Sequence, residues 1–298
     1  MDMRLNPILS IVLMFALTQI IGIAAGILLT DTAAYDENVQ SLSISPIGDT
    51  QSPLNALLML GYVLIGAGAA LFIIKYFRTK FFFRLIELAV VGGTVSILLF
   101  AFIFAFGPLD FFGSVAISSA AGAIFAIAKF FIPKLKNPAA ILSSAGVAAI
   151  FGFSMGIWPA LIFIVALSLY DYIAVFKTRH MLTLAQGLGT NELSFTVTAT
   201  DGQGKPAGEK IVSGERVSRL DLGSGDLAIP AMLAVSVYSA TGILGSIAVL
   251  IGSIISIYIT LKFVVEKHIV LPALPPICLG SLIALLISQA IALVVPLA

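Results

Sequence analysis

Charged residues are scarce in this sequence. Only 10% of the 298 residues are Asp, Glu, Lys or Arg, whereas 59% are hydrophobic, and the mean hydropathy is +1.11. A soluble domain needs far more polar surface than this composition supplies. The net charge of +1 gives no strong electrostatic attraction to nucleic acid, so no nucleic-acid partner is expected. The composition excludes a soluble globular enzyme and favours a membrane protein.

Cysteine and histidine are nearly absent. Cys278 is the single cysteine, which excludes an internal disulfide, and its apolar surroundings favour a small buried side chain. The two histidines, His180 and His268, form no cluster with metal-ligand spacing, and there is no HExxH sequence. These absences argue against a zinc metalloprotease, and we expect neither a metal nor another cofactor.

Long apolar runs dominate the chain instead. Most contain about 20 residues, the length that crosses a bilayer as a helix. We therefore predict an all-α membrane protein with nine transmembrane helices, with Trp158-Pro159 at a tight turn between the fifth and sixth. The predicted spans are roughly 6–29, 54–74, 82–106, 111–132, 138–156, 158–176, 223–241, 243–264 and 270–297.

The distribution of charge predicts how the chain crosses the membrane. With nine spans and a cytoplasmic N-terminus, all 16 Lys and Arg residues fall on the cytoplasmic side or at its helix ends, and the opposite loops carry only acids. The positive-inside bias therefore places the C-terminus outside the cell. We predict one membrane domain, 1–298, made of six helices in 1–176, a cytoplasmic loop at 177–222 and three helices in 223–298.

The cytoplasmic loop contains a predicted β-hairpin. Residues 195–200 alternate and favour a strand, 201–204 have the composition of a turn, and 210–212 are predicted to form the return strand. We expect either the edge of this hairpin or the backbone near Pro272 to pair with an extended substrate.

Three acidic residues lie inside predicted spans. Glu87 follows Arg84 by about one helical turn, so we expect a local ion pair. Asp171 and Asp226 have no basic residue within one turn. An unpaired carboxylate in hydrocarbon is energetically unfavourable, and such residues usually face a cavity and have a function.

Asp171 and Asp226 are predicted to lie at similar depths. Asp171 precedes Lys177 by six residues, about 9 Å along a helix, and Asp226 follows Arg219 by seven, about 10 Å if that stretch is helical. The loop between them returns to the same side, so the two helices run antiparallel. Adjacent helices would bring the carboxyl groups together.

Two neighbouring carboxyl groups in a low-dielectric site share one proton and titrate as a unit. The ionised member takes a proton from water while the protonated member polarises a carbonyl group, which hydrolyses a peptide without a metal. The same pair serves proton or sodium coupling in a transporter. The two aspartates alone favour the transporter slightly, and a non-catalytic scaffold for single-span helices is a third hypothesis.

Three short motifs change this balance. Asp171 follows Tyr170 in a Tyr-Asp pair, Asp226 ends the GxGD sequence that begins at Gly223, and Pro272-Ala273-Leu274 opens the last span. In this order, and on these helices of a nine-span chain, the motifs resemble those of the presenilin and signal peptide peptidase family. The predicted orientation and short length are similar to compact archaeal presenilin homologues, which implies a location in the cell membrane.

The resemblance implies an intramembrane aspartyl protease that cuts transmembrane protein substrates, with Asp171 and Asp226 as its catalytic pair. It also implies that Pro272, Ala273 and Leu274 form a turn against the active site. An ordinary proline-favoured helix start is the alternative for that segment. The sequence is compatible with a homo-oligomer and specifies neither accessory subunits nor a natural substrate.

The residues beside the aspartates have two interpretations each. Gly223 and Gly225 lack side chains, so backbone or substrate can approach Asp226, but small residues also pack helices, as we expect of Gly22 and Gly26 in the first span. Tyr170 either hydrogen-bonds near the pair or packs against neighbours. Proline removes a backbone donor, so we expect Pro230 to bend its helix.

Overall fold

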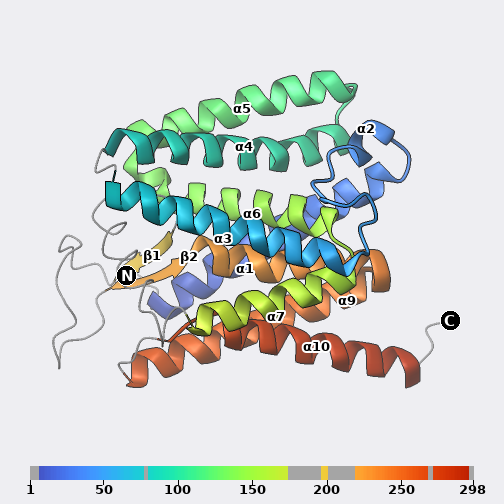
Figure 1. Ribbon diagram of the computed structural model, residues 1–298, viewed down its shortest axis with the longest axis vertical. Helices are drawn as coiled ribbons and strands as arrows, with labels where there is room; N and C mark the ends of the chain where they lie inside the picture. The colour runs from blue at the N-terminus through green and yellow to red at the C-terminus, as the bar shows by residue number, and fades with distance from the viewer. Residues whose placement is uncertain (1–6, 77–79, 174–195, 201–218, 268–270, 295–298) are drawn as a thin grey trace, which may run out of the picture.

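A computed structural model describes residues 7–76, 80–173, 196–200, 219–267 and 271–294. Long helices lie side by side in an antiparallel stack, with one small sheet at one end (Figure 1). The elements are α1 (Pro7–Ala33), α2 (Glu37–Gln40), α3 (Pro53–Tyr76), α4 (Lys80–Phe106), α5 (Phe111–Phe131), the short 3-10 helix η1 (Pro133–Leu135), α6 (Lys136–Ser154), α7 (Ile157–Ile173), β1 (Thr196–Thr200), β2 (Arg219–Gly223), α9 (Ser224–Lys267) and α10 (Leu274–Val294).

The described helices confirm a mostly helical membrane protein. Six of them are long and apolar enough to cross a bilayer, and two shorter apolar helices cover 53–66 and 157–173. Among the described residues, each predicted span overlaps a helix. The predicted seventh and eighth spans both fall in α9, whose helical geometry is interrupted at Gly242 (φ 70°, ψ −166°), a backbone conformation that essentially only glycine adopts.

The turn between α6 and α7 lies slightly earlier than predicted. α6 ends at Ser154 and α7 begins at Ile157, so Met155 and Gly156 form the link. Trp158 belongs to the first turn of α7 and is 65% exposed, as expected for a residue at a membrane interface. The link is fixed by a hydrogen bond of 2.9 Å from the Gly156 N–H to the Thr50 carbonyl.

Glycines allow α1, α6 and α9 to pack closely at the centre of the bundle. A Cβ atom at Gly22 would lie 3.2 Å from the Ala145 carbonyl oxygen of α6. One at Gly26 would lie 2.6 Å from Cγ1 of Val235, and one at Gly152 would lie 2.7 Å from the Met232 carbonyl oxygen. The predicted packing role of Gly22 and Gly26 is confirmed, and α9 is held against α1 and α6.

The predicted partner of Glu87 is wrong. Glu87 forms a buried ion pair with Lys129 of α5. The guanidinium of Arg84 instead lies 4.9 Å from the centre of the Phe130 ring, within the range of a cation–π contact. This salt bridge between α4 and α5 pairs two buried charges with each other.

The predicted hairpin is half confirmed. β1 forms at Thr196–Thr200, but its partner is β2, directly before α9, and the pairing is antiparallel with Val197 opposite Leu222. The proposed turn at 201–204 and return strand at 210–212 lie outside the described residues. Val197, Ala199 and Leu222 are buried in a cluster with residues of α1, α6 and α9, so the sheet packs onto the helix bundle.

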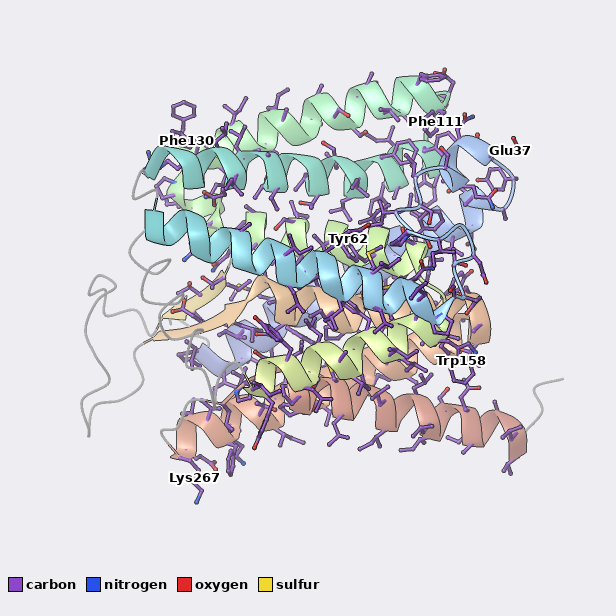
Figure 2. All side chains as sticks on the ribbon, viewed as in Figure 1. Glu37, Tyr62, Phe111, Phe130, Trp158 and Lys267 are labelled. Atoms are coloured by element: carbon purple, nitrogen blue, oxygen red, sulfur yellow. The ribbon has the colours of Figure 1, made fainter. Side chains whose placement is uncertain are left out.

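Labelled side chains mark the two ends of the helix stack. Glu37, Phe111 and Trp158 lie at one end, and Phe130 and Lys267 lie at the other, where the sheet is also found (Figure 2). α1 begins at the end that carries the sheet, whereas α10 finishes at the opposite end (Figure 1).

Candidate active site

Asp171 completes the buried stripe of α7. The stripe follows helical spacing, because Phe163, Ile164 and Leu167 are also buried and lie four to eight positions before Asp171. The side chain therefore points into the bundle although it carries a carboxyl group, and the residue is only 8% exposed. It occupies the position where the stripe would otherwise place another apolar residue.

Asp226 is held in the first turn of α9, immediately after β2. The assumption that the chain is helical from Arg219 to Asp226 is wrong, because residues 219–223 form the strand. A strand rises about 3.3 Å per residue and a helix about 1.5 Å, so the chain path from Arg219 to Asp226 is longer than predicted. The close turn between strand and helix brings Gly223 to the carboxyl group: a Cβ atom there would lie 3.2 Å from Oδ2 of Asp226.

The fold brings the two aspartates together. α7 packs against α9, and Asp171 lies close enough to Asp226 for their charges to interact. The backbone N–H of Gly223 donates a hydrogen bond to Asp226. The inference from depth therefore reached a correct juxtaposition, although one of its two distances assumed the wrong secondary structure.

The start of α10 supplies a backbone donor to the site. The N–H of Leu274 donates a hydrogen bond to Asp171. Leu274 is the first residue of α10, and the first four N–H groups of a helix have no helical acceptor, so this donor is available. Pro272 and Leu274 are buried and Ala273 is half-buried. Leu274 thus brings the start of α10 to Asp171, and the roles of Pro272 and Ala273 remain predictions.

Cys278 follows one turn later in α10. It is 3% exposed, which confirms the expected buried thiol, and it lies near enough to both aspartates to interact with their charges.

Two predicted support residues lie beside the aspartates without an observed contact to them. Tyr170 is 37% exposed and precedes Asp171, so it points about 100° away around α7. A Cβ atom at Gly225 would meet nothing within 4 Å. The roles of both residues remain predictions, and Gly225 leaves open space next to Asp226.

Two polar side chains near Asp226 are absent from the sequence-based predictions. Gln19 of α1 donates to the Leu227 carbonyl at 2.6 Å, and Ser144 of α6 donates to the Ser224 carbonyl at 3.1 Å. The sequence feature that could have indicated Gln19 is a polar residue inside the apolar run of the first predicted span. Nothing in the sequence indicated which helix it would face.

Comparison with known proteins finds one matching family and similar solved structures. Residues 10–294 match the family described as signal-peptide peptidase, presenilin aspartyl protease. Two crystal structures of a presenilin family intramembrane aspartate protease, in different space groups, are also similar. One has 25% identity and a TM-score of 0.68 over 96% of this chain, and the other has 26% identity and 0.62 over 97%; both are covered completely. No match is found among curated proteins.

Proposed function

Because the chain belongs to the signal-peptide peptidase and presenilin family of aspartyl proteases, we propose that Asp171 and Asp226 are its catalytic pair. The protein is a multi-pass integral membrane protein and an intramembrane aspartate protease. The family assignment decides between the protease and the transporter that two buried aspartates left open. The observation that carries the proposal is the approach of the carboxyl groups of Asp171 and Asp226 across the contact between α7 and α9.

The chemistry follows from one proton shared by two carboxyl groups. The ionised carboxylate removes a proton from a water molecule, whose oxygen attacks the carbonyl carbon of the scissile peptide. The protonated carboxyl group donates a hydrogen bond to the carbonyl oxygen, where negative charge develops. When this intermediate collapses, the C–N bond breaks and the leaving nitrogen takes the proton that the other carboxyl group removed from water. The Leu274 N–H holds the Asp171 carboxyl group in place during this exchange. Neither a metal nor a covalent intermediate is needed.

A pH–rate profile tests this protonation scheme. Because the mechanism needs one protonated carboxyl group, we expect kcat for a tagged single-span substrate in detergent to fall at high pH, as the shared proton is lost. The folded fraction is measured at each pH as the control. A rate that still rises well above neutral pH would contradict the scheme.

We further propose that the chain crosses the membrane nine times as one domain, with its N-terminus in the cytoplasm. Support comes from the loops on one side, whose charged residues are all acidic, and from the start of α1 and the end of α10, which lie at opposite ends of the stack (Figure 1). A reporter that is active only outside the cytoplasm should function when fused to the C-terminus. Activity of a strictly cytoplasmic reporter at that position would reverse the orientation.

We propose that an extended substrate pairs with the outer edge of β2. The outer edge of β1 is engaged at Thr198, whose N–H and carbonyl both bond the side-chain amide of Asn137, at 3.1 and 2.8 Å. The backbone N–H and carbonyl of Thr198 therefore point away from β2. Because these directions alternate along paired strands, the N–H groups of Arg219 and Gly223 point away from β1. Since the Gly223 N–H reaches Asp226, a strand on this edge would pass the catalytic site.

Deleting residues 195–212 is a poor test of this edge, because it would remove Val197 and Ala199 from the core. Arg219→Pro removes one N–H group that points away from β1 and keeps the hydrogen bonds between β1 and β2. Proline is tolerated at such an edge position. We expect KM to rise about three- to tenfold, the value of roughly one hydrogen bond. Arg219→Ala is the matched control for the lost side chain. Equal KM values for the two variants would refute pairing at this position.

A further inference from the structure

Gln19 is a polar residue in the centre of the first apolar helix. Its residue exposure is 0%, and its Nε2 donates a hydrogen bond of 2.6 Å to the carbonyl of Leu227, which directly follows Asp226. The contact joins α1 to the first turn of α9 across 208 positions of sequence. This one hydrogen bond is the polar link from the Gln19 side chain to α9.

The acceptor lies in a turn that Pro230 weakens. Proline has no N–H, so the carbonyl four residues earlier, that of Asp226, loses its helical donor, and the proline ring crowds it. In a membrane, side chains of neighbouring helices replace such donors. Here the donated bonds go to neighbouring carbonyls: Gln19 donates to that of Leu227, and the Ser144 hydroxyl of α6 donates to that of Ser224. The turn that carries Asp226 is therefore held from two sides.

The other atom of the Gln19 amide indicates that stability alone does not explain this residue. Oε1 is buried and has no hydrogen-bond partner among the described residues. An unpaired buried acceptor destabilises the folded state. Replacing Gln19 with an apolar side chain of similar size would remove one favourable hydrogen bond, but it would also remove this unfavourable oxygen. The net benefit to folding is small. What Gln19 provides specifically is the position of the Asp226 turn.

We propose that Gln19 is a positioning residue for catalysis, which fixes Asp226 relative to Asp171 through the Leu227 carbonyl. This inference rests on the proposed catalytic pair. Gln19 acts through Asp226 and does not contact substrate, so its loss should lower kcat and leave KM unchanged. Misplacement of a catalytic group by a fraction of an ångström is sufficient for a tenfold effect.

The test compares Gln19→Met with Gln19→Asn in purified full-length protein. Methionine keeps the volume and removes the donor, and asparagine keeps the amide but is one methylene too short to reach Leu227. We expect both to reduce kcat about tenfold at unchanged KM for a tagged single-span substrate. The matched control is Thr18→Val, since Thr18 is equally buried but bonds its own helix, at the Met14 carbonyl, at 2.9 Å. This control should retain full kcat.

Hydrogen–deuterium exchange supplies a readout that needs no substrate. We expect faster exchange over residues 224–232 in both Gln19 variants and unchanged exchange there in Thr18→Val. Unchanged kcat and exchange in Gln19→Asn, or an equal loss of kcat in Thr18→Val, would overturn the inference. If Asp226→Ala retained cleavage, the catalytic assignment would fail while the exchange result still decided whether Gln19 holds the turn.

Discussion

Replacing either Asp171 or Asp226 with alanine is expected to abolish cleavage. Each carboxyl group has a different task at any moment, one removing a proton and the other donating one, so neither substitutes for its partner. General acid–base catalysis contributes about 10²- to 10⁴-fold per group. Because the shared proton also disappears with either residue, we expect kcat to fall at least about 10³-fold in both single variants.

Stability should change in the opposite sense. Asp171 is 8% exposed and completes an otherwise apolar stripe, so its burial opposes folding. Alanine removes that penalty, and thermal unfolding of Asp171→Ala should occur at the same or a higher temperature than that of the wild type. Loss of activity would then not result from misfolding. Such an opposition of activity and stability is expected of a residue retained for function.

The measurement uses purified protein in detergent with a tagged single-span substrate, and products are separated by mass. Asp110→Ala is a suitable acidic control, because Asp110 caps the start of α5, where it accepts the Gly113 N–H at 3.1 Å. It should cut at the wild-type rate. Persistent cleavage in well-folded Asp171→Ala and Asp226→Ala would disprove the catalytic assignment.

The helices were predictable because the bilayer imposes their length. An apolar run of about 20 residues has few alternatives in a membrane, where every backbone group must be bonded internally. The sequence also singled out both aspartates, because a carboxyl group without a nearby base is conspicuous in such a run. It could not show that α7 and α9 are neighbours, since that depends on packing between helices.

Side-chain partners were less predictable than spans. Glu87 has a base one turn away in sequence, yet it pairs with Lys129 on another helix. Thr196–Thr200 has the alternation of a strand, yet it pairs with residues 219–223, which the estimate of depth had treated as helical. In both cases a distant partner in the fold replaced a local one, and local spacing carries no information about such contacts. The partnership of Gln19 with Leu227 has the same origin.

Removing the Leu274 N–H is also expected to lower kcat strongly. Leu274→Pro deletes this donor to Asp171 without deleting a helical hydrogen bond, because Leu274 is the first residue of α10. Proline is favoured at that position, and Ala273, which would precede it, lies outside the helix. The substitution should therefore fold, and it should alter the catalytic site selectively.

The expected size follows from the nature of the bond. A hydrogen bond to a charged group contributes about 1.5–3 kcal/mol, so kcat should fall about 10- to 100-fold. Leu274→Ala is the matched control, since it shortens the same buried side chain and keeps the N–H. If Leu274→Ala loses as much kcat as Leu274→Pro, the side chain and its packing are responsible. If only the proline variant is impaired, the backbone of α10 holds Asp171 in its catalytic position.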